Sequence, residues 1–162
     1  MTSQPEKSAH QRVVEDYFRT TSGVGSAASN DAFESSVLGL RRRLGNLLNV
    51  NGKDVVDLGS GTGELCKLAM QLGARHVVGV NMSQEEIDFA KGRVNADFVL
   101  QDIEAYLQSL PETCVDQIFA LNILEHLDKD KLLRVLEAAF RCLRPGGQMV
   151  AMVPNATSPL AA

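Results

Sequence analysis

The feature that most constrains this chain is a short apolar run that carries one acid and opens into a glycine-rich loop. The run extends from Val55 to Leu58, with Asp57 as the acid, and the loop from Gly59 to Gly63 has glycine at every second position. A buried strand that leads into such a loop, followed by a helix, is the usual way in which an α/β sheet builds a ligand crevice at its carboxyl edge. The stretch therefore predicts a small-molecule site on a parallel sheet.

Length and composition narrow the class of protein. The 162 residues are enough for one domain with its own core. The net charge of -4 argues against a broad electrostatic footprint for nucleic acid or for an anionic membrane. The amino terminus lacks the apolar core of a secretory signal, and no segment approaches the roughly 18 apolar residues of a membrane span. We therefore expect a cytoplasmic protein with neither nucleic acid nor membrane as a partner.

The chain has three cysteines, Cys66, Cys114 and Cys142, which are far apart in the sequence. Their spacing suggests neither a zinc site nor a disulfide framework, and an odd count fits a reducing compartment. The sequence therefore predicts no metal site.

Short apolar runs alternate with amphipathic stretches along most of the chain. Such alternation predicts an α/β fold with an open, doubly wound, mainly parallel sheet. Ser83 and Glu86 form a capping box at the start of one helix, and the Arg144–Gly147 turn is expected to break the last one. The expected strands are residues 54–58, 76–80, 97–100, 115–121 and 148–153, and the expected helices are residues 31–48, 63–72, 83–94, 104–110 and 128–143.

The first 30 residues are expected to form a flexible amino-terminal segment, with the α/β domain over residues 31–162. Within the segment, Val13, Val14, Tyr17 and Phe18 recur at helical spacing and suggest a short helix. Residues 20–30 are small and polar, so they form either a linker or a lid that closes over a ligand. Arg41–Arg43 point in different directions on a helix, which favours a solvent-exposed flank over a nucleic-acid site.

The residue after the loop discriminates between cofactors. A dinucleotide-binding loop requires glycine where this chain has Glu64, and the carboxylate would compete with a pyrophosphate for the amino end of the helix. A nicotinamide oxidoreductase is therefore disfavoured. A cationic sulfonium ligand would instead be helped by the nearby Asp57.

The loop and four later segments resemble, in order, the motifs of the class I S-adenosylmethionine-dependent methyltransferases. The resemblance covers about Leu47 to Asn155 and implies a Rossmann-like methyltransferase fold with S-adenosyl-L-methionine as the cofactor. The later segments are Val80–Ser83, Leu100–Ile103, Ala120–Leu127 and Leu143–Gly147.

The resemblance also implies which residues bind the cofactor. Asp57 would lie close to the amino group of the methionine moiety, Asp102 would bind the adenine amino group with Ile103 against the ring, and the backbone carbonyl of Asn122 would lie beneath the sulfonium. The remaining implied positions are the loop residues Gly59, Ser60, Gly61, Thr62 and Gly63, and Asn81 and Met82 at the end of the second strand.

Asn81 departs from the family, which usually has an acid there. An acid accepts hydrogen bonds from both ribose hydroxyls, whereas an asparagine carbonyl accepts from one while its amide donates. We therefore expect cofactor binding that is retained but weaker.

The segment after the fourth strand bears on the acceptor. His126 is the candidate general base, since its pKa suits neutral pH, and Glu125 would orient it or bind the acceptor; the alternative is a pair of solvent-facing residues at a helix start. Asn122–Glu125 lacks the prolines and aromatic residue of enzymes that methylate nucleic-acid bases. With Pro154–Pro159, which resembles bacterial enzymes of small metabolites, this favours a sugar or glycan hydroxyl or a quinone-like metabolite as the acceptor.

The family fold continues beyond a fifth strand with a helix and two more strands, for which this chain is too short. We therefore expect five strands, with Met149, Val150, Met152 and Val153 on an exposed sheet edge. Either the chain is a fragment, or a homodimer or another partner covers that edge. The alternative function is a non-catalytic S-adenosylmethionine-binding or dimerisation module.

Overall fold

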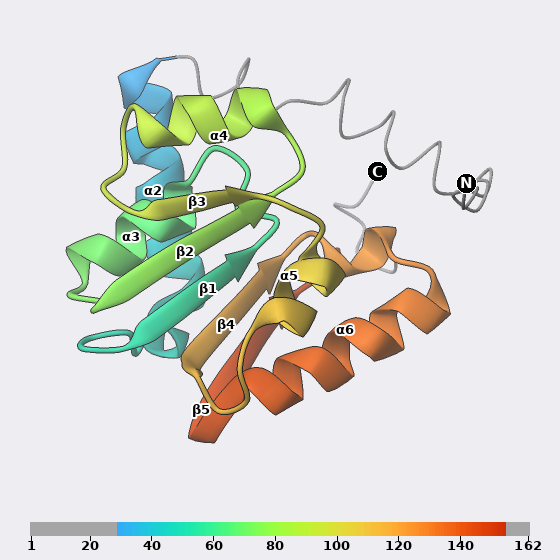
Figure 1. The fold of residues 1–162 in the computed structure, drawn as a ribbon. Coiled ribbons are helices and arrows are strands. Elements are labelled where there is room, and N and C mark those ends of the chain that lie inside the picture. The colour runs from blue at the N-terminus through green and yellow to red at the C-terminus, as the bar shows by residue number, and fades with distance from the viewer. Residues whose placement is uncertain (1–28, 155–162) are drawn as a thin grey trace.

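The computed structural model describes residues 29–154, and its centre is a parallel sheet of five strands in the order β3-β2-β1-β4-β5 (Figure 1). The predicted helix near Val13 and nearly all of the predicted lid lie outside the described residues. The predicted open parallel fold is confirmed. The strands are β1 (Asp54–Leu58), β2 (His76–Asn81), β3 (Asp97–Leu100), β4 (Val115–Leu121) and β5 (Leu143–Met152).

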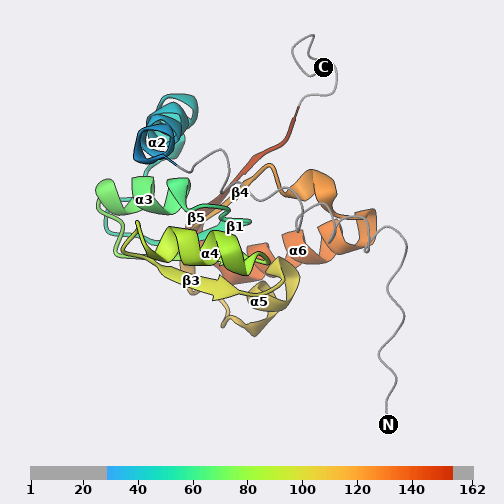
Figure 2. The same cartoon turned by 90° about the horizontal axis from the view of Figure 1, so that it is seen from above.

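Helices cover both faces of this sheet (Figures 1 and 2). One core lies between the sheet and helices α2, α3 and α4, and a second lies between the opposite face and helices α5 and α6. The central strands β1 and β4 are therefore buried on both sides, which explains their continuous apolar runs. The helices are α2 (Asn30–Leu44), α3 (Glu64–Gln71), α4 (Gln84–Lys91), α5 (Ile103–Ser109) and α6 (Lys129–Cys142), with short 3-10 segments η2 (Gly45–Leu47) and η3 (Leu124–His126).

Polar side chains fix where the helices begin. The predicted cap of α4 is present, because the Ser83 hydroxyl accepts a hydrogen bond from the Glu86 N–H. Asp102 caps α5 and Asp128 caps α6 in the same way. Each cap satisfies a backbone donor that the first helical turn leaves unpaired, and so sets the point at which the chain leaves the preceding strand or loop.

The fifth strand begins earlier than the sequence predicts. Helix α6 ends at Cys142, and Leu143 already pairs with Val115 of β4. The pairing is then interrupted and resumes at Gln148 opposite Gln117, so the predicted break at Arg144–Gly147 is a bulge inside β5. Helix α6 does end just before this stretch, as predicted, but the predicted start of the strand at Gln148 was wrong, because proline and glycine also occur at irregularities inside an edge strand.

Strand β5 lies at one edge of the sheet formed by the described residues, as the sequence predicted. The four apolar residues of that edge differ in exposure. Val150 is buried against the α2 and α3 side of the sheet, Met149 and Met152 are half-buried, and Val153 is exposed. Whether a second copy or another protein pairs with this edge stays a prediction.

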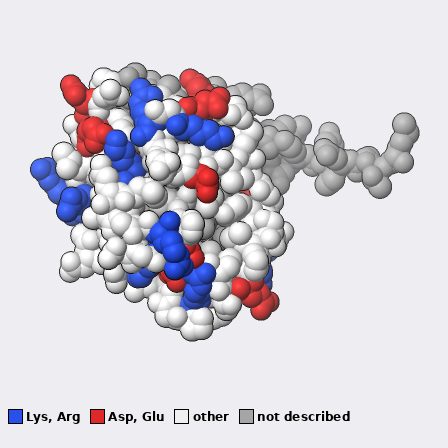
Figure 3. Space-filling model, turned by 60° about the vertical axis from the view of Figure 1, so that its left-hand side comes forward, with Lys and Arg blue, Asp and Glu red and all other residues white. Residues whose placement is uncertain are grey.

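A cluster of four charged side chains joins the strands at their amino ends. Arg144 of β5 contacts Asp54 of β1 at 2.9 Å and Asp116 of β4 at 2.8 Å, and Arg75, just before β2, contacts Asp54 at 2.6 Å. The hydrogen bond from Arg75, together with Arg144, lowers the pKa of Asp54 to about 2. Figure 3 shows basic and acidic side chains interspersed on one face of the molecule, with no large patch of one sign among the described residues there.

We predict that Asp54→Asn lowers the free energy of unfolding by about 1–2 kcal/mol at pH 7, because two arginines lose their shared carboxylate. The folded-state pKa lies below the unfolded value of 3.8, so this contribution is present above that value and is lost as the pH falls towards 2. Urea unfolding at pH 7, 4 and 2.5 measures the effect. Asp97→Asn, at the exposed first position of β3, is the control with little expected change.

Candidate functional site

The order of the strands creates a crevice at the carboxyl edge of the sheet. The chain passes from β1 to β2 on one side and from β3 to β4 on the other, so the connections diverge between β1 and β4. A cavity of about 380 Å³ opens there. It is lined by Asp57, Gly59, Ser60, Gly61, Thr62, Glu64 and Leu65 from β1 and the loop, by Leu121, Asn122 and Met152 near the ends of β4 and β5, by Ser36, Gly39, Leu40 and Arg43 from α2, and by Glu86 from α4.

Two loop glycines have different reasons for lacking a side chain. At Gly61, φ is +51°, and a Cβ would meet no other atom of the described residues within 4 Å, so its place is open towards the cavity. At Gly63, φ is +91°, and a Cβ would lie 3.0 Å from Ala90 and 3.2 Å from Phe98. Gly63 therefore lets the start of α3 pack closely against α4 and β3, while Gly61 leaves room for a ligand.

The hydroxyls of this loop are buried but not equally satisfied. Thr62 donates from Oγ1 to Glu64 Oε1 at 2.7 Å. Ser60 Oγ is buried and has no hydrogen-bond partner among the described residues. A buried hydroxyl without a partner is unfavourable, so a polar ligand in this cavity would satisfy it.

Asp57 is a buried acid at the base of the cavity, with 3% of its surface exposed. Burial raises its pKa, a hydrogen bond from Cys66 Sγ at 3.5 Å opposes the shift, and the nearby Glu64 adds to it, so that the pKa is about 7. The carboxyl group therefore changes protonation near neutral pH. A cation bound beside it would favour the ionised form.

Helix α2 supplies pocket residues that the sequence analysis did not identify. Arg41, Arg42 and Arg43 are all exposed, as the predicted flank requires, but Arg43 also lines the cavity, and its Nη1 lies 4.0 Å from Met152 Sδ. Together with Ser36 and Leu40 it forms one helical face with spacings of four and three residues. That spacing is visible in the sequence, but nothing in the sequence indicates which face of the helix lines the cavity.

At the end of β2, Asn81 is buried and Met82 is half-exposed. The Asn81 amide nitrogen donates to Glu86 Oε2 at 2.7 Å and lies 3.5 Å from the Gly61 carbonyl, and Asn81 Oδ1 accepts from the Met82 N–H at 2.9 Å. Glu86, which lines the cavity, was identified in the sequence only as a capping residue. Contacts of Asn81 and Met82 with a ribose stay predictions.

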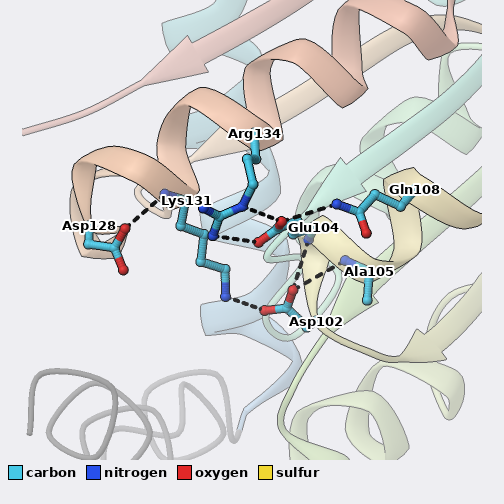
Figure 4. A network of polar contacts seen from close by, with 7 residues as sticks. All are labelled: Asp102, Glu104, Ala105, Gln108, Asp128, Lys131 and Arg134. Carbon is cyan, nitrogen blue, oxygen red and sulfur yellow. Dashed lines mark hydrogen bonds and ion pairs between the residues drawn. The ribbon is translucent and has the colours of Figure 1, made fainter. Parts of the chain in front are cut away.

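The predicted adenine contacts come from Asp102 and Ile103. Figure 4 shows Asp102 in a polar network: Oδ1 accepts from the N–H groups of Glu104 and Ala105, and Oδ2 accepts from Lys131 Nζ at 2.6 Å. A carboxylate has further lone pairs for an adenine amino group. Ile103 belongs to the core beside α6 and is 5% exposed. Neither residue lines the cavity, and both assignments stay predictions.

The segment after β4 holds the remaining predicted residues. Asn122 lines the cavity in a left-handed conformation with φ of +54°, and its N–H donates to the Met152 carbonyl at 2.8 Å. Glu125 and His126 lie on η3, with 4.0 Å between Glu125 Oε1 and His126 Nε2. Neither is among the residues that line the cavity. Their catalytic roles stay predictions.

Residues 55–147 match the methyltransferase domain family. This chain belongs to that family. It is 33% identical over 107 residues to a ubiquinone biosynthesis O-methyltransferase of Pseudomonas fluorescens, covering 63% of this chain and 44% of the relative. It is 31% identical over 103 residues to a ribosomal protein L11 methyltransferase of Shewanella woodyi, covering 63% of this chain and 34% of the relative.

A solved structure of an S-adenosylmethionine-dependent methyltransferase from Archaeoglobus fulgidus has the same fold. It superposes with a TM-score of 0.68 at 26% identity, covering 91% of this chain and 59% of that chain. The predicted resemblance and Rossmann-like fold are confirmed, and S-adenosylmethionine is confirmed as the cofactor at the level of the family. This chain spans less than half the length of the two curated relatives, whose names give different acceptors.

Residues 29–154 contain no group of three or more His, Cys, Asp or Glu side chains that could hold a metal ion. In the same part of the chain, no helix is both long enough and apolar enough to cross a membrane.

We predict that Asp57→Asn changes the pH dependence of stability. The folded-state pKa lies above the unfolded value of 3.8, so wild-type protein loses stability as the pH rises from about 4 to 7, and the variant does not. As the pH rises from 6 to 8, the free energy of unfolding of wild type should fall by about 1 kcal/mol relative to that of the variant. Urea unfolding without ligand measures this, and parallel pH curves for the two proteins would contradict it.

Proposed function

We propose that this chain binds S-adenosylmethionine in the cavity beside the Gly59–Gly63 loop and transfers its methyl group to a hydroxyl of a small molecule. The observation that carries the proposal is the composition of the cavity wall, which combines an open glycine loop with acidic side chains and one arginine. Membership of the methyltransferase domain family supports the reaction class. The acceptor that we propose is a sugar or glycan hydroxyl or a quinone-like metabolite.

The charges of the cavity suit this ligand. The charged side chains among its described lining residues are Asp57, Glu64, Glu86 and Arg43. S-adenosylmethionine carries two cationic groups and one carboxylate, so an acidic wall with a single arginine is complementary to it. A dinucleotide has two phosphates, which Glu64 would repel at the amino end of α3. The unpaired hydroxyl of Ser60 offers one further hydrogen bond.

The residues that would hold the methionine moiety come from three elements. We assign Asp57 to the ammonium group, because it is the most deeply buried of the acids that line the cavity. Arg43 of α2 would pair with the carboxylate, and the Asn122 carbonyl would lie beneath the sulfonium. This arrangement would place the ammonium and the carboxylate of the ligand beside opposite charges, and the sulfonium beside a carbonyl oxygen.

S-adenosylmethionine supplies a methyl group on a positively charged sulfur, which needs no further activation. The protein therefore has to hold the acceptor oxygen in line with the carbon–sulfur bond, exclude water and take up the hydroxyl proton. We assign the uptake of this proton to His126, which follows β4 at the carboxyl edge of the sheet. We assign the orientation of the His126 imidazole to Glu125. The imidazole of His126 would take up the proton that the acceptor hydroxyl loses when the methyl group is transferred from sulfur to oxygen and S-adenosylhomocysteine is left.

Two acceptor classes have support among the relatives. The name of the Pseudomonas relative supports a quinone-like small molecule, and the name of the Shewanella relative supports a protein. Purified protein is incubated with methyl-labelled S-adenosylmethionine in three separate reactions. The acceptors are hydroquinones and catechols in the first, sugars in the second and ribosomal protein L11 in the third. Label in a small molecule supports the proposal, and label only in the protein supports the second candidate. Binding without transfer to any acceptor supports the non-catalytic module.

We predict that Gly61→Val weakens binding of S-adenosylhomocysteine by at least about 30-fold, because its side chain would occupy the open face of the loop. Gly52→Val is the matched control, since Gly52 also has a positive φ of +68° and no close neighbour but is not part of the cavity wall. Calorimetry compares the three proteins. Unchanged affinity of Gly61→Val would mean that the ligand lies elsewhere.

We predict that Arg43→Gln weakens binding of S-adenosylhomocysteine by about 10-fold, which is the usual value of one charge-assisted hydrogen bond. Arg42→Gln, on the same helix but outside the cavity wall, should change it less than about twofold. Methylthioadenosine lacks the amino acid part, so Arg43→Gln should bind it as wild type does. Equal losses for both ligands would exclude a pairing with the carboxylate.

A further inference from the structure

The carboxylate of Glu86 lies at the end of β2, although Glu86 belongs to the first turn of α4. The residue is buried, with 9% of its surface exposed, and it lines the cavity. Its Oε2 accepts a hydrogen bond of 2.7 Å from the amide nitrogen of Asn81, the last residue of β2. The side chain thus reaches from the helix back to the edge of the sheet.

The orientation of the Asn81 amide is fixed from both sides. Its oxygen accepts from the Met82 N–H at 2.9 Å, and its nitrogen faces Glu86 and, at 3.5 Å, the Gly61 carbonyl. Turning the amide over would place its oxygen against two acceptors and its nitrogen against a donor, so only one orientation is compatible with these neighbours. The Asn81 oxygen therefore already accepts one hydrogen bond within the chain, and the Asn81 nitrogen donates to Glu86.

We infer that Glu86 is the residue whose carboxylate accepts the hydrogen bonds of the cofactor's ribose hydroxyls, and that Asn81 is the positioning residue that orients it. The inference rests on the proposed function, because it concerns the same ligand. The contact with the ribose is thereby assigned to α4, whereas the sequence analysis assigned it to the end of β2. A carboxylate only accepts hydrogen bonds and can accept from two neighbouring hydroxyls at once.

The helix end also suits an ionised Glu86. Ser83 caps α4 and accepts from the Glu86 N–H at 3.3 Å, so the carboxylate belongs to the first turn, where the helix dipole favours negative charge. The neutral amide of Asn81 adds a hydrogen bond without adding charge. The two contacts together hold the Glu86 carboxyl group in the cavity wall.

The pair explains why asparagine stands at position 81. An aspartate there would place a second carboxylate about as close to Glu86 as the present hydrogen bond, and two buried carboxylates at that distance cannot both ionise. Replacing the amide by the acid would therefore disturb the acceptor that is already present. Position 81 and position 86 act as one unit with a single negative charge.

The inference is tested by calorimetry with S-adenosylhomocysteine and with its 2′,3′-dideoxy analogue at pH 8. Glu86→Gln should bind S-adenosylhomocysteine about 10-fold more weakly than wild type, and should bind the dideoxy analogue within about twofold of it. Glu85→Gln, in the same helical turn but exposed, is the matched control and should bind both ligands as wild type does. Thermal unfolding of each variant confirms that it is folded.

A second pair of variants tests the shared charge. Asn81→Asp alone should weaken binding of S-adenosylhomocysteine about 10-fold at pH 8, because it creates two facing carboxylates. In the double variant with Glu86→Gln, the affinity should recover to within about threefold of wild type. The double variant again has one acid and one amide, now with the acid at position 81 and the amide at position 86. Additive losses in the double variant would overturn the pairing.

The outcomes separate this inference from the proposed function. If wild type binds S-adenosylhomocysteine and Glu86→Gln binds it equally well, the ribose assignment is wrong and the proposed function stands. If Glu86→Gln loses the same affinity for the dideoxy analogue, Glu86 has a structural role only and the assignment is again wrong. If wild type itself does not bind S-adenosylhomocysteine, the proposed function is overturned, and the ribose assignment with it.

Discussion

The packing of β1 between two layers of helices is the constraint on which the rest of the structure depends. Successive side chains of a strand point to opposite faces, so Val55 enters the core beside α2 and α3, while Val56 and Leu58 enter the core beside α5 and α6. Asp57 shares the face of Val55, and there it meets Cys66 of α3. The burial of this acid, and hence its raised pKa, follows from the strand in which it lies.

The same packing sets a balance between stability and binding. Asp57 is unfavourable when it is ionised without a partner, and a cationic ligand would recover that cost. At the opposite edge of the sheet, Asp54 has two arginines beside it and favours the folded state when ionised. The two acids of β1 differ in this way because one faces the cavity and the other faces solvent-accessible guanidinium groups. Functional sites commonly keep unfavourable groups that the rest of the fold must compensate for.

Much of the fold was predictable because hydrophobic periodicity and caps are local signals. β3 and β4 have the predicted bounds, and the start of α4 follows from Ser83. The start of β5 was not predictable from Arg144–Gly147, since a bulge opposite β4 depends on a partner strand that is distant in sequence. Of the site, the sequence alone indicated the loop and Asp57, because motif and strand lie together in the chain. Asp102 was predicted as a ligand, and the structure shows that it also caps α5.

The sequence by itself determined the parallel α/β fold, the glycine loop and the preference for a cationic ligand, since each depends on residues that are neighbours in the chain. Only the tertiary structure decided that Arg43 and Glu86 join the cavity wall. Arg43 is there because Phe33, Val37 and Leu44 pack α2 into the core that α3 also forms. Glu86 is there because Asn81 holds it from the end of β2. The contact between α2 and the loop is fixed by the shapes of both packed surfaces, which no single stretch of sequence contains, and the Asn81–Glu86 contact depends on how α4 folds back against the end of β2.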